Sequence, residues 1–460
     1  MGSLSGALSI ALGSLGANDG AVAITANNIA NVDTPGYSRE LVNLTENYPV
    51  QEGRLTFGTG VTLGQTTSVR DNLLNIRLDQ ENQTSSQLTA FLGSLNQVQS
   101  LFNETSGSGL QAPLTAFFNS FTQLSDNPGD SSLRESVITA GQNLASAIQQ
   151  DAANLQSLQR SADLGVQQSV TQINTLTSQI ASLNTQISGL VGAGQDASSF
   201  LDQRDQLVQQ LSGLIGISQT PAGNDSLTIS TANGASLVVA GESFALSTQQ
   251  NNQTGFQDVI SNGADITSAL TGGTIGGDIQ ARDQAIPSIL NQLDTFSYGL
   301  TNAVNAQSEA GFDANGNAGV AFFTPLASST GAASSIGVAI SDPNLVAASS
   351  DGTVGSNGNA QALANLQNQN VIDGQTPANY YGSLVFQIGN EVSNANAEQT
   401  SVGLVQQQLQ NQLGAESGVS LDEEAVNLIR YQSAYQASAN VVSVVNQLFY
   451  TLINMDEITT

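Results

Sequence analysis

The sequence predicts a mainly α-helical protein with a small β-rich insertion, drawn out as an elongated rod of several domains. Three observations predict this fold class. Apolar residues recur at helical spacing through most of the 460 residues. The stretch 218–275 is instead rich in Gly, Ser, Thr and Asn and alternates with the period of strands. Aromatic residues make up only 5% of the chain, and a surplus of small and amide side chains suits slender coiled coils better than a wide globular core.

The N-terminal stretch predicts an amphipathic helix that ends before Pro35-Gly36, a turn signal. Its apolar positions follow a seven-residue repeat of alternating four and three steps, and Asn18 and Thr25 fill two of these positions. The apolar members are Leu4, Leu8, Ala11, Leu15, Val22 and Ile29.

Short strands and loops are predicted over 37–70, where the alternation is nearer to period two. Helical spacing then returns from about Asp71 to Val98, over 112–124, and over 130–190. The last of these blocks ends in the clearest heptad of the chain, a narrow stripe suited to one helical partner. That heptad consists of Ile173, Leu176, Ile180, Leu183, Ile187 and Leu190.

A shorter helix over about 201–211 returns after two glycines, so an antiparallel helical rod is expected. Within the insertion, residues 227–231 and 236–240 flank Asn233-Gly234 and predict a β-hairpin.

The chain then returns to helical spacing over 278–308, with a kink or break expected at Pro287. Gly- and Ser-rich loops with short strands are expected over 311–358, and further helices over 359–369 and 377–415.

A long final helix is predicted from 421 to 455, and Ser420 and Glu423 fit a reciprocal capping box at its start. Narrow stripes at both chain ends cannot be covered by a lone helix in water. Pairing the ends buries one side of each, and the rest is expected to seek identical neighbours; two helices packed on an ordinary globular domain are the alternative. The C-terminal stripe is Leu421, Leu428, Tyr431, Tyr435, Val442, Val445, Phe449 and Leu452.

Composition excludes several kinds of function. The chain has no Cys and no His, which excludes a cysteine nucleophile, a Ser-His-Asp triad and the usual zinc sites. A carboxylate-only hydrolase or a Ca²⁺ or Mg²⁺ site stays open on these grounds, but Asp313–Asn317 is interpreted as a plain turn, and no cofactor, metal site or enzymatic activity is expected. A net charge of −28 disfavours nucleic acid and anionic lipid. No run of 18 apolar residues and no Sec signal peptide are found, so no membrane insertion is expected.

Two terminal motifs carry a family resemblance. Residues 26–39, ANNIANVDTPGYSR, resemble the N-terminal signature of flagellar rod, hook and hook-associated proteins, and residues 420–439, SLDEEAVNLIRYQSAYQASA, resemble the matching C-terminal end. The Tyr37-Ser38-Arg39 ending and the stretch FLDQRDQLVQQLS at 200–212 are most similar to the hook-associated protein 1 family. Shorter agreements lie at Gly58–Val61 with Val69–Asp71, at Gly276–Asp283, and at Gly311–Phe323, which leaves 218–275 as the main unmatched part.

The resemblance implies a structural subunit of the hook-filament junction that forms a ring of identical copies between the hook protein and the second hook-associated protein. It implies export by the flagellar type III route without a cleaved signal peptide, an extracellular location, and an export chaperone on the C-terminal helix. The implied domains are an inner coiled coil of residues 1–35 and 418–460, a helical rod domain of 36–217 and 276–417, and an outer β-rich domain of 218–275.

Residues at both chain ends are therefore expected to make contacts in the assembled flagellum. The C-terminal stripe named above is also expected to bind the chaperone. Asn27, Asn28 and Asn31 are expected to bond either across neighbouring copies or within one chain, and Arg39 to pair either with a neighbour's carboxylate or in an ordinary ion pair. The alternatives for function are a hook or distal-rod subunit, or a surface adhesin that uses 218–275. The N-terminal assembly residues are Leu4, Leu8, Leu15, Val22, Asn27, Asn28, Ile29, Asn31, Pro35, Gly36, Tyr37 and Arg39.

Overall fold

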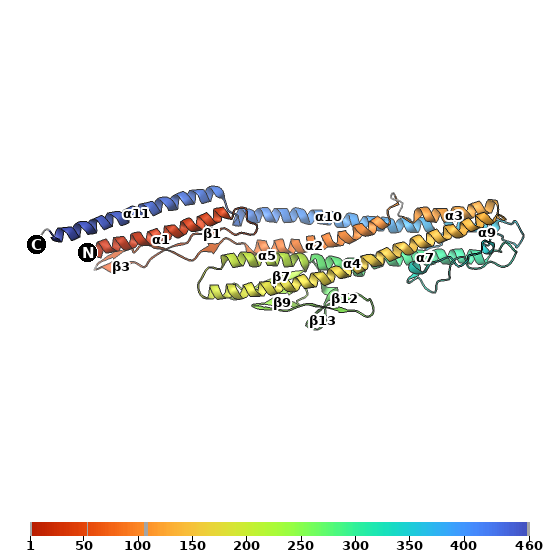
Figure 1. The fold of residues 1–460 in the computed structure, drawn as a ribbon, viewed down its shortest axis with the longest axis horizontal. Coiled ribbons are helices and arrows are strands. Elements are labelled where there is room, and N and C mark those ends of the chain that lie inside the picture. Colours follow the sequence, from red (N-terminus) through yellow and green to blue (C-terminus); the bar gives the residue numbers. More distant parts are fainter. Residues whose placement is uncertain (1, 53, 105–108, 458–460) are drawn as a thin grey trace. The chain divides into compact units, whose positions relative to one another are not determined.

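The computed structural model describes residues 2–52, 54–104 and 109–457, most of them helical (Figure 1). Their contacts define two compact units. The first unit contains Met1–Gln83, Gln172–Leu246 and Gly403–Thr460, and the second contains Thr84–Thr171 and Ser247–Val402. The β-rich stretch 218–275 is divided between them, because its strands before Ser247 belong to the first unit and the later ones to the second. The three-domain division remains a prediction.

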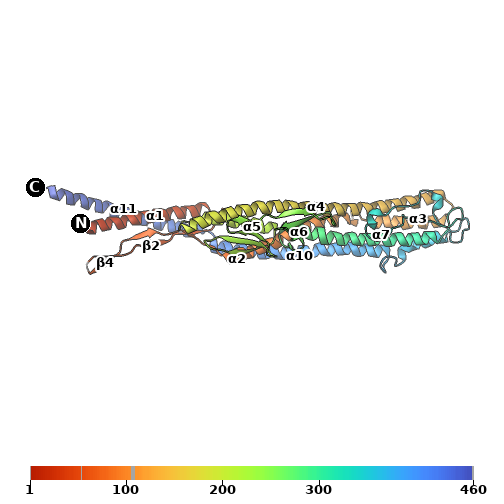
Figure 2. The ribbon, with the colours of Figure 1, turned by 90° about the horizontal axis from the view of Figure 1, so that it is seen from below.

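In the first unit, the two chain ends form an antiparallel helix pair, α1 (Gly2–Ala30) and α11 (Leu421–Glu457), which lie side by side in Figures 1 and 2. Their seam is lined on α1 by small residues, and Ser14 Oγ lies 2.8 Å from Ser438 Oγ. The predicted polar seam positions are buried and paired, since Asn18 Nδ2 donates to Ser14 O at 2.7 Å and Thr25 Oγ1 donates to Ala21 O at 2.9 Å. The seam is therefore narrow, and the buried side chains of Asn18 and Thr25 have hydrogen-bond partners in it.

The helix α1 is unusually apolar for its exposure. By length and composition Leu4–Ala30 is apolar enough to cross a membrane, with a mean hydropathy of 1.3, yet only 22% of that window is buried. A buried core helix would not leave this much apolar surface open.

Residues 40–68 form one interrupted β-hairpin, which we call the arm. Its antiparallel strand pairs are nested around the tip. The outer pair is β1 (Glu40–Leu41) with β6 (Thr67–Ser68), the middle pair is β2 (Leu44–Glu46) with β5 (Val61–Leu63), and the tip pair is β3 (Val50–Glu52) with β4 (Leu55–Phe57).

The arm lies on α1 because glycines open the helix surface. A Cβ at Gly20 would lie 2.5 Å from Leu63 Cδ2, and one at Gly13 would lie 3.2 Å from Val61 O. Gly60, with φ of +95°, sits against Ile10. A side chain at Gly13 would crowd the Val61 carbonyl of β5, and one at Gly60 would also need a strained positive φ. A side chain at Gly20 would displace the end of the Leu63 side chain.

The rest of the first unit is built on the end of α4 (Ser131–Gly192), against which α5 (Ser198–Leu214) returns. The predicted hairpin is present as β8 (Leu227–Thr231) and β9 (Ser236–Val239), within a four-stranded sheet ordered β10-β9-β8-β7. The outer strands are β7 (Ile217–Pro221) and β10 (Glu242–Ser243). Asn184 of α4 holds the sheet, since its Nδ2 donates to Leu227 O at 2.7 Å and to Ala240 O at 2.8 Å.

The second unit has a hydrophobic core of its own, made by helices and a phenylalanine cluster. Four helices that contribute to it or flank it are α3 (Gln111–Asp126), α7 (Ile286–Glu309), α8 (Ala332–Ser335) and α9 (Gly358–Asn365). Two long helices, α2 (Asn72–Leu101) and α10 (Pro377–Ser417), have residues in both units. The clustered rings, which pack in tilted or edge-on pairs, are Phe117, Phe118, Phe121, Phe322 and Phe323.

The break expected at Pro287 takes the form of a π-helical turn, Ala281–Ala285, between α6 (Gly273–Gln280) and α7. Arg282 in this turn is fully buried; its Nη1 donates to Asp163 Oδ1 at 2.7 Å and to Gln257 O at 2.8 Å. It thereby fastens β12 (Gln257–Ser261), which pairs with β11 (Ser247–Gln250) and β13 (Ala264–Asp265).

The short strands expected over 311–358 are wrong in detail. That stretch makes isolated bridges, such as Phe312 with Ala318 and Phe323 with Val338, and no named strand. Single buried phenylalanines anchor the loops there, so regular strand pairing is not needed to hold them.

Candidate assembly site

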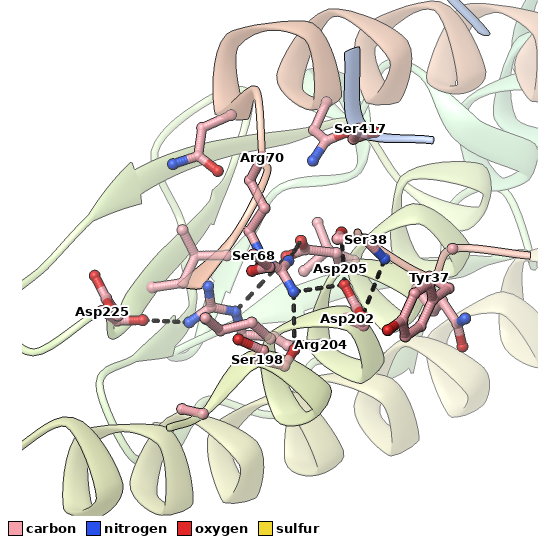
Figure 3. A pocket seen from close by; sticks show the side chains of 18 of the residues that line it. Tyr37, Ser38, Ser68, Arg70, Ser198, Asp202, Arg204, Asp205, Asp225 and Ser417 are labelled. Atoms are coloured by element: carbon pink, nitrogen blue, oxygen red, sulfur yellow. Dashed lines mark hydrogen bonds and ion pairs between the residues drawn. The ribbon is translucent and has the colours of Figure 1, made fainter. Parts of the chain in front are cut away.

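The motifs at Tyr37–Arg39, Val69–Asp71 and 200–212 converge on one place in the first unit, which we call the joint. It surrounds a cavity of about 720 Å³ where α1 ends, the arm begins and ends, α5 passes, and α10 gives way to α11 (Figure 3). Charged side chains of both signs line it, among them Arg70, Asp202, Arg204 and Asp205.

The carboxylate of Asp202 holds both ends of the arm. Ser38, before the arm, donates its Oγ to Asp202 Oδ1 at 2.7 Å and its amide to Oδ2 at 3.2 Å. Arg70, after the arm, donates Nη2 to the same Oδ1 at 2.5 Å (Figure 3). One α5 carboxylate therefore closes the base of the arm, with charge-assisted bonds that are stronger than neutral ones.

Arg70 extends this closure along α5. Its Nη1 lies 2.5 Å from Asp205 Oδ2, its Nη2 donates to Ser198 O at 2.8 Å, and its Nε donates to Ser68 Oγ at 2.7 Å. Burial raises the pKa of Asp205, while the cations of Arg70 and Arg204 act in the opposite direction. Most donors of the Arg70 guanidinium are thus occupied. Its side chain is largely buried, and hydrogen bonds are electrostatically stronger in such surroundings than in water.

Arg39 fastens the start of α11. Its amide donates to Ser417 O at 3.1 Å, its Nε to Glu424 Oε1 at 2.9 Å, and its Nη1 lies 2.8 Å from Glu423 Oε2. Glu424 is only 2% exposed, so removal of Arg39 would leave a buried carboxylate without its cation.

The predicted capping box is only half present. The Glu423 amide reaches Ser420 Oγ at 3.5 Å, but the Glu423 side chain pairs with Arg39 and does not return to the cap. The ion pair competes for the carboxylate because Arg39 presents a full positive charge and the backbone amide does not.

The asparagines at the end of α1 bond within the chain. Asn28 exchanges two bonds with the backbone of Glu40, both at 2.9 Å, and accepts from Tyr37 Oη at 2.8 Å. Asn27 Nδ2 donates to Tyr37 Oη at 3.3 Å, and Asn31 Nδ2 to Asn27 O at 3.0 Å. Burial and the Glu40 charge raise the pKa of Tyr37, so it stays a neutral donor. These asparagines, like Arg39, thus make bonds within the chain, and bonds to a neighbouring copy stay a prediction.

Pro35-Gly36 ends the first helix and also meets α5. Gly36 has φ of +77°, and a Cβ there would lie 2.6 Å from Gln206 Nε2, which itself donates to Pro35 O at 2.7 Å. The turn therefore needs glycine for its backbone angle, and a side chain there would displace Gln206 from its bond to Pro35.

The charged groups of the joint make structural contacts. No group of three or more Asp or Glu that could hold a metal ion occurs among the described residues. The ionic groups of the joint bind segments of the chain to one another, which suits a part that fixes the position of the α1–α11 pair within the first unit.

The predicted stripe of α11 lies mainly against α1, since Tyr431 and Val445 are buried and Leu428, Val442 and Phe449 half-buried. Leu421, Tyr435 and Leu452 are exposed. On α1, Leu4, Leu8, Leu15, Val22 and Ile29 are all half-buried.

A second apolar row on α11 is left uncovered, and of its members the sequence prediction included only Leu452. We call it the open stripe; it consists of Val441, Val444, Leu448 and Leu452, all of them exposed. Their spacing of three and four residues places them on one helix face, which adjoins the seam at Leu452, seven residues after the buried Val445. A search for two apolar faces on one helix would have found them.

The joint residues Arg70, Asp202 and Asp205 were also missed as site residues, although they lie in the quoted motifs. Only the fold brings residue 70 to residue 202, so no local spacing could signal the pair.

Three family matches cover the chain in part. Residues 95–323 match the family described as flagellar hook-associated protein FlgK helical domain. Residues 8–37 match the family described as flagella basal body rod protein, and residues 413–455 match flagellar basal body rod FlgEFG protein C-terminal. The two ends therefore match families described as flagellar basal body rod proteins, and the middle matches a hook-associated family.

Curated relatives match over nearly the full length. The flagellar hook-associated protein 1 of Bacillus subtilis strain 168 is 30% identical, and the alignment covers 96% of each chain. That of Escherichia coli K12 is 28% identical, covering 98% of this chain and 100% of the relative.

A solved structure is also similar. The flagellar hook junction protein FlgK from Burkholderia pseudomallei superposes with a TM-score of 0.65 at 18% identity, covering 73% of this chain and 99% of that one. At this identity the likeness concerns the fold alone.

Proposed function

The chain belongs to the flagellar hook-associated protein 1 family and is a structural protein of the hook-filament junction, and from this premise we propose that copies of it assemble through the exposed faces of α1 and α11. It is part of the bacterial flagellum and assembles with other flagellar axial proteins. The finer partners that we propose are identical copies in a ring, the hook protein on one side and the second hook-associated protein on the other.

The observation that carries the proposal is an apolar and nearly uncharged surface on a strongly acidic chain. Net charge is −28 over the whole sequence, and like-charged copies repel one another. Yet Asp19 is the one charged residue in 2–32, and Arg430 the one in 425–453. The open stripe lies within the second of these segments, so copies can meet there without bringing acidic groups together.

Contacts between copies are expected to be of the head-to-tail kind. The open stripe and the exposed Ile10 and Leu12 of α1 are different surfaces, so a copy can meet one neighbour through α11 and another through α1. Such contacts close into a ring when the rotation between copies permits it.

The joint supports this use of the terminal pair. A subunit that links two different neighbours must hold its contact surfaces in a fixed relation, and Arg39, Arg70 and Asp202 fasten the pair to α5 and α10. We assign the joint a mechanical role and the chain no catalytic one.

Export and chaperoning remain part of the proposal. An exposed stripe on the last helix needs cover before assembly, and an export chaperone bound to residues 421–452 would supply it. Passage by the type III route without a cleaved signal peptide fits a chain that has no Cys to trap in disulfides.

A charge placed on the open stripe tests the proposal. Val444→Asp in the flagellated host should abolish incorporation of the chain at the junction, with filament protein shed into the medium. Ser443→Asp is the matched control, because it adds the same charge one residue away on a different face of the exposed helix. Equal incorporation of both variants would refute the assembly role of the stripe.

A further inference from the structure

We propose that the tip of the arm is a second contact between copies, and that its apolar face docks on the open stripe of α11 in a neighbouring copy. This inference rests on the proposed function and names the occupant of a surface which that function leaves unassigned.

The β3–β4 tip has one mainly apolar face, whose one charged register position is Glu52, opposite Leu55. Val50 and Phe57 are directly opposed partners in the register, and cross-strand partners lie on the same face of a hairpin. Tyr48 lies two residues before Val50, in the irregular stretch between β2 and β3. These side chains are 95% (Tyr48), 53% (Val50) and 50% (Phe57) exposed. The other face carries Gln51 opposite Thr56, which are polar.

Such a face is unfavourable on a free molecule. A two-stranded hairpin alone is marginally stable in water, and large exposed apolar side chains at its tip lose contact with water only when a partner covers them. The tip is therefore expected to gain its cover from another chain.

The neighbour's open stripe fits as the occupant for two reasons. The first is charge. Contacts between copies of a chain with net charge −28 are least opposed where carboxylates are absent. Glu52 gives the tip face one negative charge, and the open stripe has no carboxylate to repel it. Both surfaces are mainly apolar, so their burial against each other is favourable.

The second reason is continuity. The same arm already packs on an apolar helix within its own copy, where Leu63 covers Gly20 and Gly60 meets Ile10 of α1. The tip, seen beside α1 in Figure 2, continues from that contact and belongs to the same unit as the helix pair. Copies that meet through their terminal helices thereby bring arm and stripe into the same interface.

The Asp202 closure makes the docking less costly. Ser38 and Arg70 bind one carboxylate, so the base of the arm is ordered before any partner arrives. Conformational entropy that the base of the arm has already lost before association adds no further cost to binding.

Cysteine cross-linking tests the inference, because the chain has no native cysteine. Phe57→Cys and Val444→Cys are made in one chain and expressed in flagellated cells, flagella are isolated, and mild oxidation is followed by a non-reducing gel. A ladder of covalent oligomers is expected, since head-to-tail docking joins each tip to the next stripe. Thr56→Cys with Val444→Cys is the matched control on the polar face, and each single variant is a second control; these should give no ladder.

The outcomes separate the two proposals. If the chain is present in isolated flagella but the Phe57 pair gives no more oligomer than the Thr56 pair, the arm inference is overturned and the proposed function stands. If the double-cysteine chain cross-links only within itself, the inference is likewise overturned. If Val444→Asp incorporates normally, the proposed function fails first, whatever the cross-links show.

Discussion

Ser38 and Asp202 are 164 residues apart in sequence, yet their side chains meet at 2.7 Å in the joint. Arg70 binds the same carboxylate oxygen, so a single α5 residue closes a 32-residue excursion of the chain. The arm thereby depends on a helix that begins far beyond it in sequence.

Asp202→Asn is expected to loosen the arm without unfolding the second unit. The change removes the charge that strengthens bonds from Ser38 and Arg70, at a cost of about 1.5–3 kcal/mol for bonds to a charged group. Amide exchange read by mass spectrometry should become faster over 38–70 and stay unchanged over 286–309. Asp422→Asn, at an exposed acidic residue of α11, is the control and should alter neither region.

Arg39→Ala should destabilise the start of α11 because it leaves Glu424 buried without its cation. A broken buried pair costs about 3–5 kcal/mol, and the cost here should lie at or below the low end since the Arg39 side chain keeps 21% of its exposure. Urea unfolding followed by exchange at 417–430 measures it. The double variant Arg39→Ala, Glu424→Leu should recover much of the loss; a double variant as unstable as the single one would contradict the ion-pair explanation.

Stability should fall as pH rises from about 4 to about 7, in part through Asp79. Burial raises the pKa of this carboxyl to about 7, whereas its ordinary value is 3.8. Between these values the unfolded chain releases a proton that the folded chain keeps, so unfolding becomes easier with pH and levels off above 7. Asp79→Asn keeps an oxygen for Gln219 Nε2, which lies 2.7 Å away. The difference in thermal midpoint between pH 5 and pH 8 should therefore shrink in this variant, and an unchanged difference would exclude Asp79 as a source.

Two glycine-to-alanine changes in the second unit should have opposite signs. At Gly277 of α6 a Cβ would lie 2.3 Å from the backbone oxygen of Gln87, so Gly277→Ala forces α6 away from α2 and should cost about 1–3 kcal/mol. At Gly93 of α2 nothing lies within 4 Å, and Gly93→Ala should stabilise by about 0.5–1 kcal/mol. Denaturant midpoints of the two variants decide it, and a shift in the same direction for both would contradict the close-approach reading of Gly277.

Local pattern was enough to place most helices. The heptad of 173–190, the glycines after it and the apolar rows at both ends predicted α4, α1 and α11, because a helix face repeats every three to four residues whatever surrounds it. The hairpin at 227–239 was predicted for the same kind of reason, since Asn233-Gly234 suits a tight turn. The family resemblance, too, was carried by short contiguous motifs, and the comparisons confirmed it.

Tertiary structure alone decided the joint and the uncovered faces. Arg39 was predicted to form an ion pair, but its partner Glu424 was not predicted. The capping role predicted for the Glu423 side chain is replaced by its own ion pair with Arg39. The open stripe became distinct from the seam only once α1 was in place, because an apolar residue on a helix has the same sequence signature whether it faces a partner or water. Partner choice depends on the path of the whole chain through space, whereas periodicity records only which residues share a face.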